Sequence, residues 1–207
     1  MNESSIIEVF ADVACPFTHV GLRRFVERRA EVGRTDVRLK ARAWPLEFVN
    51  GVPMDAAFIA EEVATIRNHV APDLFIGFEE ASFPSTSLPA FALAAAAYRM
   101  RDAVGEAVSL ELRTLLFEDG LDIASDAVIG ELADKHGVTI TDEDRSAAAK
   151  DHAEGVERKV IGSPHFFTPG GAFFCPTLDV SRDANGELHV QMDSGGFNEF
   201  IDSCFGI

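Results

Sequence analysis

Of the three cysteines in this sequence, Cys15 is the residue best placed to act as a nucleophile. Cys15 lies in the segment 12–18 (DVACPFT), where Thr18 stands three residues on, at the place of a second thiol. A thiol on the first turn of a helix faces unpaired N–H groups and the positive end of the helix dipole, which stabilise its thiolate. The thiolate is the nucleophilic form. The sequence therefore predicts a reactive, partly exposed Cys15 with a lowered pKa.

The elements around Cys15 are predicted from their patterns. Residues 6–10 (IIEVF) are short, apolar and β-branched, which is typical of a buried strand. Apolar residues recur at helical spacing from Cys15 onward, and Pro16 suits the first helical position. Residues 37–44 alternate apolar and basic side chains and end at Trp44-Pro45, which predicts a second, half-buried strand. Together they indicate a right-handed βαβ unit with parallel strands.

The middle of the chain is predicted to be helical. Helices are expected over 54–69, 88–100, 104–117, 127–136 and 142–159, whereas 73–80 is irregular or a short strand. Expected caps are Ser85–Ser87, Ser125 with Gly137, and a capping box of Thr141 with Asp144. β-structure returns at 163–168 and, after a loop carrying Cys175 and a hairpin turn at Asn185-Gly186, at 188–192. A helix over 197–204 closes the chain.

This order of elements predicts an α/β protein, a thioredoxin fold with a large helical insertion between its βαβ and ββα halves. Residues 1–50 and 160–207 would form the thioredoxin-like domain, and residues 51–159 the inserted helical domain. The 207 residues are enough to bury a full core.

Composition excludes several classes of function. The 34 acidic and 18 basic residues give a net charge of −16, which disfavours nucleic acid and anionic membrane surfaces as partners. We expect no membrane span, because the longest apolar run, near residues 88–98, is far shorter than the ~20 residues that a span needs. We expect no signal peptide, since strand-like residues begin at Ile6. Three cysteines form no disulfide framework, so a reducing cytoplasm is the expected compartment. The histidines show no metal-ligand spacing, and we expect no metal and no nucleotide.

The segment 12–25 resembles the DsbA family of the thioredoxin superfamily, in the branch of FrnE-like oxidoreductases, kappa-class glutathione transferases and 2-hydroxychromene-2-carboxylate isomerases. In FrnE-like relatives the corresponding segment resembles D-x-x-C-P-W-C. In the transferase and isomerase groups it resembles D-x-x-S-P-Y-S. Residues 162–164 (GSP) are similar to the family's cis-proline segment, and residues 83–87 (FPSTS) of the helical block are a further match. This chain has a cysteine at position 15, as the first group does, but a hydroxyl at Thr18 in place of the second cysteine. Neither the dithiol oxidoreductase activity nor the transferase or isomerase activity is therefore implied in full.

The resemblance implies a site in which Cys15 and Thr18 are catalytic. Substrate contacts are expected from Pro16, Phe17, His19, Ser163, Pro164 and His165, although the ring of His19 can instead point elsewhere along its helix. Pro164 is expected to follow a cis bond and to pack against Cys15. Asp12 either tunes the thiol or caps the local turn. Cys175 is either a resolving thiol or a free buried cysteine, and Cys204 is expected in the core.

Three functions follow as alternatives. The first is a thiol–disulfide oxidoreductase with Cys15 as its single active-site cysteine, whose mixed disulfide is resolved by an external low-molecular-weight thiol. The second is a kappa-like glutathione transferase or an isomerase. The third is a binding module without redox activity. No tightly bound cofactor is expected; glutathione or another small thiol, a small disulfide and protein thiols are the expected partners, for a monomer or a homodimer.

Overall fold

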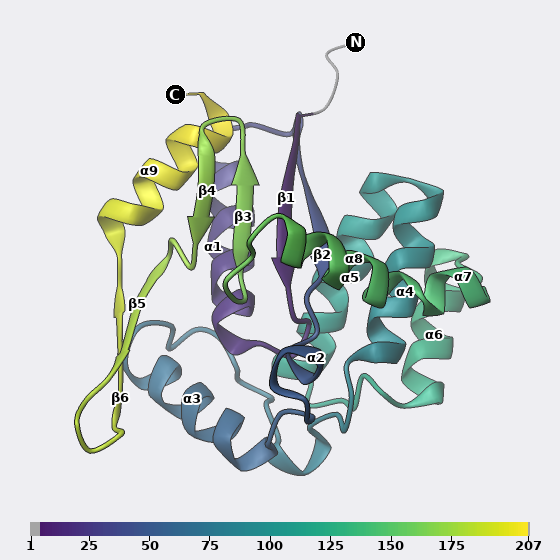
Figure 1. The fold of residues 1–207 in the computed structure, drawn as a ribbon, viewed down its shortest axis with the longest axis horizontal. Coiled ribbons are helices and arrows are strands. Elements are labelled where there is room, and N and C mark those ends of the chain that lie inside the picture. Colours follow the sequence, from purple (N-terminus) through teal and green to yellow (C-terminus); the bar gives the residue numbers. More distant parts are fainter. Residues whose placement is uncertain (1–4, 207) are drawn as a thin grey trace.

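A four-stranded sheet lies at the centre of the computed structural model, which describes residues 5–206 (Figure 1). Its strand order is β2-β1-β3-β4. β1 (Ser5–Ala11) runs parallel to β2 (Val37–Ala43) and antiparallel to β3 (His165–Thr168), and β4 (Gly171–Phe174) pairs with β3. The parallel β1–α1–β2 unit is as predicted. After the Gly170-Gly171 turn, where a loop carrying Cys175 is expected, residues 171–174 form a strand in which Phe173 pairs with Phe166.

Two helices pack on one face of this sheet. α1 (Pro16–Glu31) and α9 (Ser194–Phe205) bury an apolar cluster that includes Phe25, Phe166 and Phe200. Cys204 belongs to this cluster and is 4% exposed, which confirms its expected place in the core. The sheet is thus held between this helical layer and α8 (Ala147–Glu157) on its other face, where Gly155 leaves no room for a Cβ against Phe10 and Trp44.

A helical insertion separates the two halves of the sheet, as predicted. It lies beside and below the sheet in Figure 1, and its helices share one core with Val13, Ala14 and Val20 of the segment around Cys15. The short α2 (Leu46–Asn50) precedes it. Its own helices are α3 (Ala56–His69), α4 (Leu88–Met100), α5 (Asp102–Phe117), α6 (Asp126–His136), α7 (Asp142–Arg145) and α8 (Ala147–Glu157).

The second hairpin does not join the central sheet. β5 (Leu178–Arg182) and β6 (Leu188–Met192) form a separate two-stranded sheet that packs beside α3 (Figure 1). The turn at Asn185-Gly186 is therefore as predicted, with Gly186 at a positive φ of 84°. Its strands extend past the edge of the thioredoxin-like sheet instead of lengthening it.

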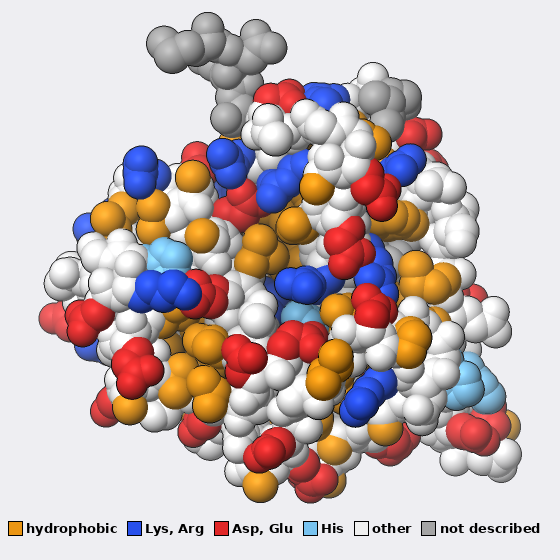
Figure 2. Space-filling view, turned by 180° about the vertical axis from the view of Figure 1, so that it is seen from behind, with side chains coloured by type: hydrophobic (Ala, Val, Ile, Leu, Met, Phe, Trp, Pro, Cys, Tyr) orange, Lys and Arg blue, Asp and Glu red, His pale blue; other side chains and the backbone are white. Residues whose placement is uncertain are grey.

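Charge is distributed without a dominant patch on the face in Figure 2, where acidic and basic side chains are interspersed with apolar ones. Within residues 5–206, none of the helices combines the length and apolarity that a bilayer crossing requires.

Candidate active site

Cys15 is the N-cap residue of α1, and Pro16 is the first residue of that helix. β1 ends at Ala11, and a turn over residues 12–14 leads to the N-cap residue Cys15. Asp12 fixes that turn: its Oδ1 accepts the N–H of Ala14 at 2.8 Å and the hydroxyl of Ser87 at 2.9 Å, and its Oδ2 accepts the N–H of Leu46 at 2.7 Å. Local capping is therefore the role that the structure gives Asp12.

Ser163 connects this turn to the loop before β3. The Sγ of Cys15 donates to the Ser163 carbonyl oxygen at 3.4 Å, and the hydroxyls of Thr18 and Ser163 lie 2.8 Å apart. The N–H of Asp12 donates to the same Ser163 hydroxyl at 2.9 Å. The Ser163–Pro164 peptide bond is cis, and α1 packs on this loop through Gly21, whose missing Cβ would lie 3.8 Å from Pro164 Cγ. The structure thus brings Cys15, Thr18, Ser163 and Pro164 together.

Cys15 is 3% exposed, which corrects the prediction of a partly exposed, acidic thiol. Burial raises the pKa of the Cys15 thiol above its usual value, and the nearby Glu62 carboxylate raises it further. Hydrogen bonds with the Thr18 side chain, Ser163 and the Thr18 N–H lower the pKa without offsetting burial. The sequence pattern predicts the donors at the helix start, but not the packing that removes water from them.

Cys15 lines a cavity of about 440 Å³ between α1, α2 and α3. Its walls are mostly apolar, and Cys15, Ser163 and Glu62 are among its polar lining groups. The described lining residues are Cys15, Pro16, Phe17, Leu46, Asn50, Val52, Pro53, Met54, Asp55, Phe58, Ile59, Glu62 and Ser163. Pro16, Phe17 and Ser163 therefore stand where a ligand beside Cys15 would contact them.

The two predicted histidines lie elsewhere. The ring of His19 is buried between Phe75 and Phe117, and its Nε2 is 2.6 Å from Glu118 Oε1. His165 stacks on Phe167 at 5.0 Å, and its Nδ1 accepts the N–H of Ile161. Burial lowers the pKa of both histidines. Neither ring is among the described residues that line the Cys15 cavity, so their expected substrate contacts are not formed there.

Cys175 lies near the same loop. Its N–H donates to the Pro164 carbonyl oxygen at 3.0 Å, and its φ of 43° is unusual for a residue with a Cβ. Burial raises the pKa of the Cys175 thiol to about 12, and the nearby Cys15 raises it as well. Cys15, Cys175 and Cys204 are all free thiols.

Sequence reasoning missed three groups around Cys15. Ser87 reaches Asp12 from the start of α4, and Glu62 lines the cavity from α3. Arg113 is 2% exposed; it donates to the Asp12 carbonyl oxygen at 3.3 Å, and its Nε has no partner. Burial lowers the pKa of Arg113 to about 10. One signal was available: Arg113 lies on the apolar stripe of α5 beside Leu112 and Leu116, where a charge is unusual.

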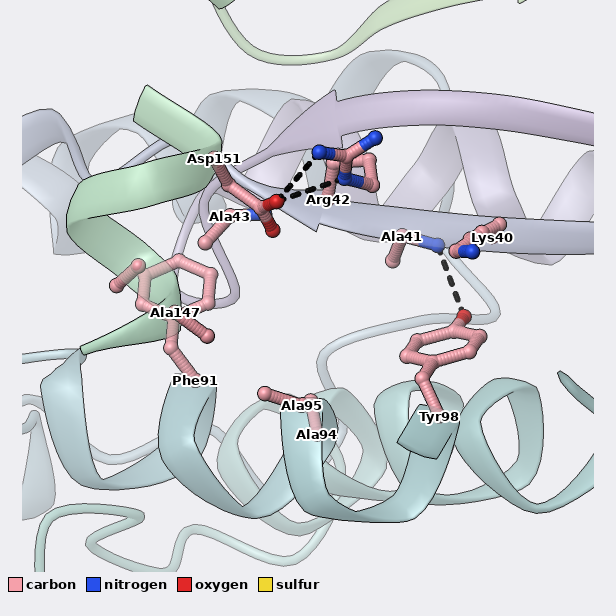
Figure 3. A pocket seen from close by; sticks show the side chains of 11 residues that line it. Lys40, Ala41, Arg42, Ala43, Phe91, Ala94, Ala95, Tyr98, Ala147 and Asp151 are labelled. Carbon is pink, nitrogen blue, oxygen red and sulfur yellow. Dashed lines mark hydrogen bonds and ion pairs between the residues drawn. The ribbon is translucent and has the colours of Figure 1, made fainter. Parts of the chain in front are cut away.

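A second cavity, of about 300 Å³, lies along the outer edge of β2 (Figure 3). The hydroxyl of Tyr98 accepts the N–H of Ala41 at 2.8 Å, and Asp151 accepts the N–H of Ala43 at 2.9 Å. These contacts satisfy the unpaired edge of the strand. None of the predicted site residues is among the described residues that line this cavity.

One group of possible metal ligands lies far from Cys15 in the sequence. Asp183, Glu187 and His189 are exposed at the β5–β6 turn, and their ligand atoms lie within 4.8 Å of one another. Asp183 already accepts the N–H groups of Asn185 and Glu187, at 2.8 and 2.9 Å, so it serves the turn itself. The absence of a metal remains a prediction.

The fold and the position of the cysteine define a class: a thioredoxin-like sheet interrupted by a helical insertion, with a thiol at the start of the first helix. A family model described as the DSBA-like thioredoxin domain matches residues 6–184, and the chain belongs to that family. A comparison with curated proteins gives no match.

Solved structures share the fold at low sequence identity. The cytosolic disulfide reductase DsbM from Pseudomonas aeruginosa is 15% identical, with a TM-score of 0.62 over 95% of this chain and 97% of that chain. DsbM with GSH gives 14% identity and a TM-score of 0.56, over 95% and 97% of the chains. A 2-hydroxychromene-2-carboxylate isomerase is 13% identical, with a TM-score of 0.60 over 82% and 88%. The similar proteins thus include both a reductase and an isomerase.

Proposed function

We propose that this protein is a DsbA-like thiol–disulfide oxidoreductase with Cys15 as its single catalytic cysteine. The observation that carries the proposal is the position of the Cys15 sulfur. It lies at the start of α1 and contacts the Ser163–Pro164 loop, and Cys15 lines a cavity of about 440 Å³. A disulfide bound in that cavity would have one sulfur beside the Cys15 thiol.

The exchange has two steps. Cys15 gives up its proton, and its sulfur attacks one sulfur of a disulfide; a new S–S bond forms to Cys15, and the other half leaves as a thiolate that takes up a proton. An external thiol then attacks the substrate sulfur of the mixed disulfide. Cys15 regains its thiol, and the external thiol ends in a new disulfide. The hydroxyls of Thr18 and Ser163 and the buried cation of Arg113 favour the negative charge that forms on the sulfur.

An external thiol is needed because Thr18 replaces the second cysteine. Cys175, with a thiol pKa of about 12, is almost fully protonated near neutrality and is a poor resolving nucleophile. Glutathione or another small thiol is the proposed resolving partner, and small disulfides or protein thiols are the proposed substrates. The DsbM structure with GSH supports this choice. The reducing cytoplasm is the proposed compartment, in line with the cytosolic DsbM.

The test is reduction of bis(2-hydroxyethyl) disulfide by an added thiol, compared among the wild type, Cys15→Ala and Cys175→Ala. We expect C15A to fall to the uncatalysed rate and C175A to keep most of the activity. Mass spectrometry of the wild type should find the mixed disulfide on Cys15. A C15A variant with full activity would falsify the proposal. If C175A also lost its activity, Cys175 and not an external thiol would be the resolving thiol.

A second candidate is a glutathione-dependent transferase or isomerase, favoured by the raised pKa of the Cys15 thiol. In such an enzyme, Cys15 and Thr18 would orient the sulfur of a bound thiol cofactor while Cys15 itself stays reduced. Turnover of an electrophile by the wild type, with Cys15 still reduced by mass spectrometry and with activity kept in Cys15→Ser, would favour this candidate over the first.

A further inference from the structure

The cavity beside Cys15 has acidic groups in its wall but no basic ones. Glu62 and Asp55 are its ionisable residues besides the thiol, and none of the described lining residues is Lys, Arg or His. Asp55 uses one carboxylate oxygen as the N-cap of α3, where it accepts the N–H of Phe58 at 2.9 Å. A ligand in this cavity would therefore meet negative charge and apolar surface, but no cation that could hold a carboxylate.

Glu62 is the unusual member of the pair. It is 8% exposed, and its partner is Arg182, whose guanidinium lies 3.6 Å away, at the outer limit of an ion pair. Arg182 also pairs with Glu61 at 3.4 Å, donates to the Gly186 carbonyl oxygen and lies over the ring of Phe58. A nearly buried carboxylate that lines the cavity and is so weakly paired would gain from a ligand that brings a positive charge.

We propose that this cavity selects disulfides that carry a protonated amine close to the sulfur, with Glu62 as the residue that determines the preference. The inference rests on the proposed exchange at Cys15. In the first step the Cys15 sulfur bonds to one aminoalkyl sulfur, and the other half leaves as an aminoalkyl thiolate that takes up a proton. Neutral disulfides are accepted less well, and disulfides whose only charges are carboxylates are disfavoured.

The preference should depend on pH through the charge of Glu62. Burial raises its pKa to about 7; Arg182 on β5 lowers it, and Glu61 on α3 raises it. Cys15 faces the same cavity, and its own ionisation speeds the reaction with every disulfide alike. The ratio of two rates removes that common effect. The cationic-to-neutral ratio should therefore rise between pH 6 and 8, as Glu62 becomes charged.

The experiment measures formation of the mixed disulfide on Cys15 of the reduced protein by mass spectrometry. Three disulfides of similar size are compared: cystamine (cationic), bis(2-hydroxyethyl) disulfide (neutral) and 3,3′-dithiodipropionate (anionic). Each rate is divided by the rate of the same disulfide with a free thiol, which removes intrinsic reactivity. At pH 8 we expect cystamine to exceed the anionic disulfide by about tenfold or more, the order of one close charge pair at a partly buried site.

Two variants assign the effect. In Glu62→Gln the charge preference should disappear. Glu61→Gln is the matched control, because Glu61 is exposed, shares Arg182 and lies outside the cavity wall, and it should keep the preference. Equal normalised rates in the wild type, or an unchanged preference in E62Q, would overturn the inference while leaving the exchange intact. If no disulfide modifies Cys15 of the folded protein, the proposed function fails and the inference with it.

Discussion

At the Cys15 sulfur two opposing influences meet. Its position at the start of α1 and its hydrogen bonds with Thr18 and Ser163 favour the thiolate, whereas removal from water favours the thiol. Burial has the larger effect, because the sulfur lies between α1, α3 and the Ser163–Pro164 loop. The sulfur is accordingly a thiol, which donates to the Ser163 carbonyl oxygen.

This balance predicts the pH dependence of alkylation. The rate at which iodoacetamide labels Cys15 should rise with pH, with a midpoint above the value of about 8.5 of an unperturbed cysteine. Quantitative mass spectrometry of the labelled peptide from pH 6 to 11 measures it. A midpoint below 8 would contradict this prediction and support the lowered Cys15 pKa that the sequence pattern indicates.

Thr18 should alter that midpoint in a defined direction. Thr18→Val removes the hydroxyl that helps to hold negative charge on the sulfur, so the pKa of Cys15 should rise further and labelling at pH 8 should slow. Thr18→Ser keeps the hydroxyl and should label at nearly the wild-type rate. Equal slowing in both variants would point to altered packing around the fully buried Thr18, not to the lost hydrogen bond.

At the scale of elements, the close contact of α8 with the sheet depends on one glycine. A Cβ on Gly155 would lie 2.5 Å from the ring of Trp44 and 3.1 Å from Phe10, and the Trp44 ring also stacks on His152 of α8. Gly155→Ala should destabilise the protein by about 1–3 kcal/mol, because buried aromatic rings must move. Gly130, in the middle of α6, has no atom within 4 Å of its missing Cβ, and Gly130→Ala should stabilise by about 0.5–1 kcal/mol.

Urea unfolding of the two glycine variants beside the wild type measures both changes. The change in the free energy of unfolding is expected to have opposite signs in the two Gly→Ala variants. The comparison therefore separates the effect of packing from that of helix propensity. A Gly155→Ala variant as stable as Gly130→Ala would mean that α8 can move away from the sheet without cost.

Local signals predicted those elements that local chemistry determines. Pro16 marked the start of α1, Gly137 ends α6 at a positive φ of 64°, and Thr141 with Asp144 forms the predicted capping box. One local prediction was wrong: the helix begun at Asp142 breaks at Ser146. Ser125 is the N-cap residue of α6, as predicted, but its side chain makes no capping hydrogen bond. Residues 73–80 form no strand, because the N–H groups of Phe75 and Ile76 bond to the Glu118 carboxylate instead.

The site residues likewise fall into those that the local sequence predicts and those that only tertiary packing brings to the site. Cys15 was predicted from its place at the start of a helix, and Thr18, Ser163 and Pro164 through the resemblance of their segments to the DsbA family. Glu62, Ser87 and Arg113 come from three different helices of the insertion, and only the packing of those helices brings them to the site. Burial of Cys15 has the same origin, so a pattern read along the chain predicts its donors but not its pKa.

For the whole molecule, carboxylates fall into two groups that respond oppositely to pH. Arg99 lowers the pKa of Asp144 to about 2, and Arg42 and Arg158 lower that of Glu154 at the junction of α8 with the sheet. Such groups contribute stability above their unfolded pKa near 4, and it is lost as the pH falls through their folded values. Glu62 has a raised pKa, so its contribution is present below about 4.5 and is lost as the pH rises through about 7.

These opposite signs predict a maximum of the unfolding free energy near pH 5. It should fall toward pH 2 as the paired carboxylates become protonated, and between pH 5 and 8 as Glu62 becomes charged in a nearly dry site. Glu62→Gln should remove about 2 kcal/mol of the second decline, while Glu61→Gln should retain it. Urea unfolding of the three proteins at pH 3, 5 and 8 measures the curves. Each variant carries one negative charge fewer than the wild-type chain of net charge −16, so general repulsion is matched between E62Q and E61Q. The difference between these two variants therefore tests the Glu62 assignment, and parallel curves would refute it.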